Sequence, residues 1–322
     1  MGYTCKRKKR HLSTFNFNME RILIQLVKFS LFATLFYVVG ILFLGIFVSP
    51  RLLKNLPNCY RDTYFRLNDI SKKDSLDILF LGSSHAYRGF DTRFFATYGY
   101  TSFNLGTSSQ TPIQTNYLLK KHLPHLHPKL IIYEVNPEIL ASDGIESTLD
   151  IISNAPLDFS TVGLLQKTST NIKIYNTFIY HCFKQFFNIK TNVAEFVNDS
   201  DNYIDGQGYV EKQSIEFIKT PNDVIKYTIR EDQLQAFNEI ISTFKKLNFN
   251  YILVQAPVTK NELKTYTNNS EVDSLFNSYG RYYNFNKTNT PLSDSLHFYD
   301  SHHLNQTGVI IFNKKLIEEL RL

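Results

Sequence analysis

The chain has 322 residues, of which 43% are hydrophobic and 20% charged, so it holds enough apolar material for a folded core and is not generally disordered. Its formal net charge is +6, but five positive charges lie together in the segment 6–10, KRKKR. The rest of the chain carries about +1 (6 minus 5), which excludes the broad basic surface of a nucleic-acid-binding domain. We therefore expect no nucleic-acid partner.

The first element expected along the chain is a membrane-spanning helix. Residues 29–48, FSLFATLFYVVGILFLGIFV, carry no charge, and a helix of this length spans the hydrocarbon core of a bilayer, about 30 Å. A buried core helix and a cleaved signal peptide are the alternatives, but the apolar part of a signal peptide is only about 7–15 residues long and ends in small residues. We interpret 29–48 as a signal anchor that follows a basic cytoplasmic segment, 1–28. The positive-inside rule then places the rest of the chain on the extracytoplasmic side.

The remainder of the sequence predicts one α/β domain. Residues 49–74 are polar and mixed in charge, as expected of a linker or stalk. Four short apolar runs predict strands, at 76–82, 100–106, 129–135 and 250–258. Helical patterns begin at residue 111 and cover 230–247 and 305–320, so that they separate or follow the strands. This alternation predicts a three-layer α/β/α sandwich with a mostly parallel, flavodoxin-like sheet over 75–322. Residues 140–229 break the alternation and are interpreted as an insertion that caps the functional edge.

Two short segments carry residues suited to nucleophilic catalysis. The first predicted strand ends in FLGSSH, which places Ser84 in a strand-to-helix turn. Near the other end of the chain, HFYDSHHLNQTG places Asp300 three residues before His303. A serine nucleophile needs an imidazole to take its proton and a carboxylate to orient that imidazole. Because chemistry collects at the carboxyl ends of parallel strands, we expect these groups to meet there.

Together the turn Gly82-Ser83-Ser84, the pair Asp300 and His303 and the block HLNQTG resemble the SGNH (GDSL-like) hydrolase superfamily, in particular its membrane-anchored branch that acts in acylation of cell-envelope polymers. The resemblance implies that Ser84 is the nucleophile, His303 the general base and Asp300 the residue that orients His303. It also implies an oxyanion hole formed by Ser84, Gly106 in FNLG and Asn136 in YEVNPE, although the family's Gly-x-Asn-Asp context around the asparagine is missing.

The expected function is that of a membrane-anchored serine esterase or O-acyltransferase. It would add or remove acyl groups, with acetyl as the expected group, on an extracytoplasmic polysaccharide in the cell envelope. The partners implied are an acylated or acyl-accepting polysaccharide and the membrane, and the resemblance leaves room for an integral-membrane protein as acyl donor. No cofactor is expected.

Other interpretations of the same residues stay open at this point. A non-catalytic, membrane-tethered protein with the same fold could hold a glycan or a partner protein. Taken singly, Ser84 could cap a helix, and Gly106 and Asn136 could belong to ordinary turns. Two groups of side chains could bind a metal, but neither has the spacing of a known zinc site, so no metal is expected; the groups are His297, Asp300, His302 and His303, and His122, His125 and His127.

Overall fold

A computed structural model describes residues 12–52, 59–168, 171–189, 201–212, 217–218 and 224–322. The chain divides into two compact units, Met1–Leu53 and Lys54–Leu322. The first unit contains helix α1, Leu12–Leu52, whose part Met19–Leu44 has a mean hydropathy of 2.1 and is long and apolar enough to cross a membrane. The span expected at 29–48 falls inside α1, whereas the basic residues 6–10 lie outside the described residues.

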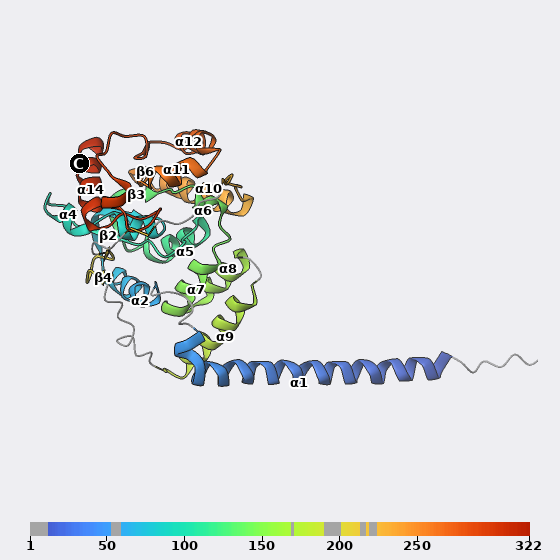
Figure 1. The fold of residues 1–322 in the computed structure, drawn as a ribbon. Helices are drawn as coiled ribbons and strands as arrows, with labels where there is room; N and C mark the ends of the chain where they lie inside the picture. The colour runs from blue at the N-terminus through green and yellow to red at the C-terminus, as the bar shows by residue number, and fades with distance from the viewer. Residues whose placement is uncertain (1–11, 53–58, 169–170, 190–200, 213–216, 219–223) are drawn as a thin grey trace, which may run out of the picture. The chain divides into compact units, whose positions relative to one another are not determined.

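The second unit is built on a five-stranded sheet in which every neighbouring pair of strands is parallel (Figure 1). The strand order is β2-β1-β3-β6-β7, and the bounds are β1 Ser75–Leu81, β2 Ser102–Asn104, β3 His127–Glu134, β6 Tyr251–Gln255 and β7 Tyr282–Asn284. This is the flavodoxin-like order, since the five strands run 2-1-3-4-5 in chain sequence. The expected α/β class is therefore confirmed. The edge strand β7 was not expected, because its three half-buried residues form no apolar run.

Helices cover both faces of the sheet. Side chains of β1 alternate between two cores, with Ile78 and Phe80 in one and Leu79 and Leu81 in the other, which explains why the second half of the strand is apolar. One face is covered by α3 Ser84–Gly89, α4 Thr92–Ala96 and α14 Gln306–Leu320. The other is covered by α5 Pro112–His122, α10 Glu231–Lys246 and α12 Asn269–Asn277. Two further short helices, α11 Lys260–Thr265 and α13 Asp294–His297, lie in the C-terminal third of the chain.

Part of the segment expected to be a linker belongs to the folded unit. Residues 49–74 contain helix α2, Cys59–Ile70, and its Leu67 and Ile70 are buried in the hydrophobic core. The expectation of a simple stalk is therefore wrong for this part. The polar composition concealed the helix, because the buried residues of α2 include polar and charged side chains as well as Leu67 and Ile70.

The insertion contains helices and a hairpin. Its helices are α6 Glu138–Ala141, α7 Ile145–Asn154, α8 Phe159–Lys167 and α9 Ile172–Phe186, and strands β4 Asp201–Tyr203 and β5 Val210–Lys212 pair antiparallel. The start of α7 does reach the functional edge, where Ser108 Oγ donates to Glu146 Oε1 at 2.6 Å. Other parts of α7 and α8 extend the core, with Leu149, Ile151 and Leu164 buried beside α5. The insertion therefore borders the edge and also enlarges the core.

Candidate active site

The turn after β1 can form only with glycine at its first position. Gly82 has φ +136°, and a Cβ atom there would lie 2.8 Å from Glu134 Cβ and 2.9 Å from the Glu134 carbonyl oxygen. Ser83 then caps α3, with its hydroxyl accepting the backbone N–H of His85 at 3.4 Å. Ser84 is the first residue of α3, so no preceding helical turn supplies an acceptor for its backbone N–H.

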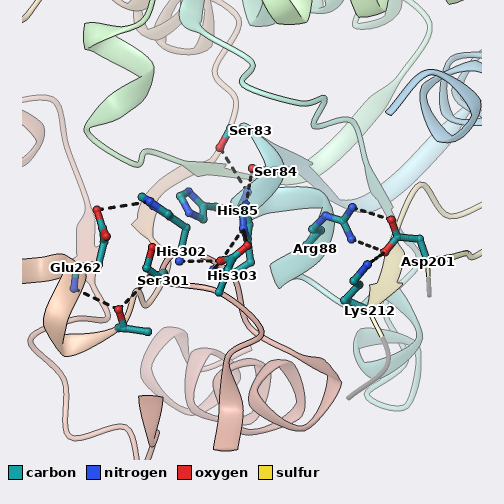
Figure 2. Close-up of polar contacts among 12 residues, drawn as sticks. Ser83, Ser84, His85, Arg88, Asp201, Lys212, Glu262, Ser301, His302 and His303 are labelled. Atoms are coloured by element: carbon teal, nitrogen blue, oxygen red, sulfur yellow. Dashed lines mark hydrogen bonds and ion pairs between the residues drawn. The ribbon is translucent and has the colours of Figure 1, made fainter. Parts of the chain in front are cut away.

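Three of the residues singled out in the sequence lie together at this turn. Ser84 Oγ lies 2.7 Å from His303 Nε2 (Figure 2). His303 Nδ1 in turn lies 2.9 Å from Asp300 Oδ2. Asp300 Oδ1 also accepts the backbone N–H groups of His302 at 2.8 Å and of His303 at 2.7 Å. The hydroxyl, the imidazole and the carboxylate thus form one continuous hydrogen-bonded chain.

The electrostatics of the pair Asp300 and His303 favour an imidazole that can accept a proton from Ser84. Burial alone would raise the pKa of Asp300, but the hydrogen bond and charge of His303 and the two backbone N–H groups hold that pKa well below its usual range. Asp300 is therefore ionised at neutral pH and fixes the proton of His303 on Nδ1, which leaves Nε2 to accept from the serine. The ring of Tyr299 lies parallel to that of His303, at an angle of 6° and a centroid distance of 5.5 Å, and restricts its rotation.

Ser84 and His303 open into a cavity whose lining residues are mostly polar in type. The lining comes from four segments of the chain and includes Ser109, Asn136 and His302. Asn136 is 4% exposed, and its Oδ1 accepts the backbone N–H of Glu138 at 2.9 Å. That contact orients the amide, and no acceptor for its Nδ2 donor is present in the described part of the chain. Asn136 is thus suited to stabilise an oxyanion in the cavity.

Gly106 lies close to the turn but does not line the cavity. Its backbone N–H donates to Asn104 Oδ1 at 3.2 Å. A Cβ atom at Gly106 would lie 2.8 Å from the Ser83 carbonyl oxygen and 2.9 Å from that of Gly82. Glycine is therefore required for close packing of two loops, and the geometry does not support the oxyanion role that the resemblance implied for Gly106.

The histidines considered as metal ligands do not converge within either group. His297 Nδ1 accepts the backbone N–H of Ser293 at 2.8 Å, and Asp300 is engaged with His303. Burial lowers the pKa of His122 to about 4, as expected of a core imidazole. Among the described residues, the group that could hold a metal ion combines His302 with Glu138 and Glu262, neither of which was singled out from the sequence.

No protein-family model matches the chain, and no curated protein is significantly similar to it. The chemistry of the site must therefore be inferred from its geometry.

A buried acid–imidazole pair lies behind the turn and was missed in the sequence. His85 is 6% exposed, its ring lies 5.0 Å from that of His303, and its Nδ1 lies 4.0 Å from Glu134 Oε1. Burial lowers the pKa of His85 well below its usual value and raises that of Glu134 to about 8, so both side chains are neutral at pH 7. A glutamate inside the apolar run LIIYEV was the available signal.

The hairpin of the insertion supports the loop that carries His303. Arg88 on α3 makes two hydrogen bonds of 3.1 Å with Asp201 on β4, and Lys212 on β5 lies 2.8 Å from the same carboxylate (Figure 2). The Arg88 guanidinium and the Lys212 ammonium both lie over the ring of Tyr299, at 5.9 and 5.6 Å from its centroid. Because Tyr299 stacks on His303, this network holds the imidazole in place.

Proposed function

We propose that the protein is a membrane-anchored serine esterase or O-acyltransferase of the SGNH type, which adds or removes acyl groups, with acetyl as the expected group, on an extracytoplasmic polysaccharide. The observation that carries the proposal is the 2.7 Å contact between Ser84 Oγ and His303 Nε2, backed by the ionised Asp300. A non-catalytic scaffold would need no such contact. The geometry therefore favours the enzyme.

The reaction would proceed through an acyl-serine intermediate. Ser84 Oγ attacks the ester carbonyl carbon while its proton passes to His303 Nε2, and the carbonyl oxygen becomes an oxyanion. The backbone N–H of Ser84 and the amide of Asn136 are placed to stabilise that charge. Collapse of the intermediate breaks the ester C–O bond, and the leaving alcohol takes the proton from His303.

The second half of the reaction repeats these steps with another nucleophile. His303 takes a proton from the incoming hydroxyl, which attacks the acyl carbon, and returns the proton to Ser84 as the acyl-serine bond breaks. Water in this position gives an esterase, and a sugar hydroxyl gives a transferase. Both share the acyl-serine intermediate.

The location on the membrane rests on α1 and on the charge before it. The apolar part of α1 supports attachment to a membrane, and the basic segment 6–10 supports a cytoplasmic N-terminus with the α/β domain on the opposite side. Protease added to sealed, right-side-out membrane vesicles should digest the domain. Digestion only after the vesicles are lysed would contradict this orientation.

The nucleophile is tested with a fluorophosphonate probe, which labels activated serines covalently. Wild type should be labelled, S84A should not, and S83A, which changes the adjacent hydroxyl, should keep its labelling. Equal labelling of wild type and S84A would refute the assignment. Hydrolysis of a chromogenic acetyl ester, with and without an oligosaccharide acceptor, then separates the esterase from the transferase by product identity.

A further inference from the structure

Three potential metal ligands meet beside the catalytic serine and have no part in the acyl-transfer chemistry. One ligand atom from each of Glu138, Glu262 and His302 lies within 4.8 Å of the other two. Glu138 begins α6, after β3; Glu262 lies in α11, after β6; and His302 belongs to the loop before α14. Since β3 and β6 are parallel neighbours, both glutamates are delivered to the same edge of the sheet.

The donor set is one imidazole nitrogen and two carboxylate oxygens. Ca²⁺ and Mg²⁺ are bound by oxygen ligands, whereas Zn²⁺ and Mn²⁺ accept this mixture of nitrogen and oxygen. Three protein ligands also leave a coordination position for water or a substrate oxygen, as in sites where zinc takes part in catalysis. The residue types therefore fit a divalent transition-metal ion.

Contacts around the three ligands already hold them in place. Tyr266 donates its hydroxyl hydrogen to Glu138 Oε1 at 2.5 Å, and the backbone N–H of His302 donates to Asp300 Oδ1. His302 Nε2 lies 3.5 Å from Glu262 Oε1, so the imidazole nitrogen already faces a carboxylate (Figure 2). Hydrogen bonds of this kind orient the ligands of metal sites.

The burial of the three ligands favours binding of a cation, and their position gives the cation access from solvent. Glu262 is only 4% exposed, and a divalent cation would offset the cost of burying its carboxylate beside a second one. Glu138 and His302 are half-buried and line the Ser84 cavity, which provides access from solvent.

A further buried group in the same cavity wall points to a ligand there. His85 lines the cavity and is 6% exposed, yet among the described residues neither ring nitrogen makes a hydrogen bond within 3.5 Å, and the Glu134 carboxylate lies 4.0 Å from Nδ1. Its ring lies 6.1 Å from that of His302. Buried polar atoms without partners are rare and are typical of sites where an ion or an ordered water belongs.

We propose that Glu138, Glu262 and His302 bind one divalent transition-metal ion, of the Zn²⁺ or Mn²⁺ class, in the wall of the Ser84 cavity. The bound ion would present its open coordination position to the cavity and so to an oxygen of a bound substrate. Metal binding does not depend on the serine chemistry, so this inference goes beyond the proposed acyl transfer and can fail or succeed without it.

The test measures Zn²⁺ affinity by competition with a chromogenic chelator, on the full chain purified in detergent. Wild type should bind one equivalent, and E138Q, E262Q and H302Q should each lose at least about tenfold in affinity. E146Q, a change to another carboxylate at the same edge, should bind like wild type. S84A should also bind like wild type, which separates this site from the proposed nucleophile.

Mn²⁺ bound to the protein and followed by electron paramagnetic resonance gives a second readout. Thermal melting identifies any variant that fails to fold. E262Q changes a buried residue and could unfold the protein, whereas E138Q and H302Q change half-buried residues and still test the site in that case. The proposal is overturned if folded E138Q and H302Q both bind Zn²⁺ with the wild-type affinity. It is also overturned if wild type binds no more Zn²⁺ than an E138Q/H302Q double variant.

Discussion

The imidazole of His303 lies 2.7 Å from the hydroxyl of Ser84, although 219 positions separate the two residues. Ser84 starts α3, and the loop that carries His303 leads into α14 on the same face of the sheet. Asn313 on α14 donates to the Gly89 carbonyl oxygen at the end of α3, at 2.7 Å, and ties the two helices together. The packing of α14 on α3 therefore sets the distance between nucleophile and base.

The first prediction concerns the residue that orients the base. D300N keeps the shape of the side chain but removes the charge that holds the His303 proton on Nδ1, so the rate of fluorophosphonate labelling should fall about 10³–10⁴-fold. D294N, which removes a charge from an exposed helix end, is the matched control and should label at the wild-type rate. A D300N rate within a few-fold of wild type would contradict the assigned role.

The second prediction concerns the amide in the cavity wall. N136A removes a donor placed to stabilise the oxyanion, so turnover of an acetyl ester should fall about 10²–10³-fold with little change in KM. N286D is the control for a change of an asparagine near the sheet edge, and its turnover should stay near that of wild type. Asn286 does not line the cavity, and its Oδ1 accepts the backbone N–H of Val258 at 2.8 Å. Loss of ester binding rather than of turnover in N136A would show that Asn136 holds the substrate instead.

The third prediction concerns pH and stability. Burial raises the pKa of Glu134 from 4.5 to about 8, so between these values the folded protein holds a proton that the unfolded chain has released. The group therefore lowers stability as pH rises through this window, by about 1.4 kcal/mol per pH unit. E134Q has no such proton to release. The free energy of unfolding of E134Q minus that of wild type should therefore be about 3 kcal/mol larger at pH 7.5 than at pH 5.5.

Urea denaturation at the two pH values measures this change. E319Q, at an exposed glutamate paired with Lys315, provides the comparison and should follow wild type. If the difference between E134Q and wild type is the same at both pH values, Glu134 is ionised in the folded protein across the window and the assignment is wrong.

The fourth prediction concerns the hairpin beside the site. Gly208 has φ +74°, and a Cβ atom there would overlap the carbonyl oxygen of Asn104 at the end of β2. G208A should therefore lower the free energy of unfolding by about 3 kcal/mol or more, since backbone strain and a steric clash add. Gly99 has a similar φ of +85° with no neighbouring atom within 4 Å, so G99A isolates the strain alone, about 1–2 kcal/mol. Equal losses in the two variants would refute the steric argument.

The parts of the fold that could be predicted from sequence are those with a strong local signal. The second half of the strand before Ser84 is buried on both faces and is therefore an apolar run, and the segments that hold Ser84 and the pair Asp300 and His303 each carry a recognisable spacing. The short edge strand β7 and the helix α2 have no such signal, because their residues are only partly apolar.

Contacts between distant segments that carry no recognisable motif could not be predicted in this way. Arg88 and Asp201 lie 113 positions apart, and only the path of the insertion brings the hairpin back to α3. Glu262 likewise reaches His302 only because β6 ends beside the loop that leads into α14. Gly106 shows the opposite case, since its position after β2 fitted the resemblance while its N–H is already bonded to Asn104.

The packing of α14 on α3 also has a consequence for when activity can arise. Under the proposed function, a growing polypeptide that contains Ser84 but not yet α14 would be inactive, because the serine would lack its base. Only after the C-terminal helix has emerged and docked does the hydroxyl meet its imidazole. Under the proposed function, an incomplete chain would therefore not attack an acyl donor.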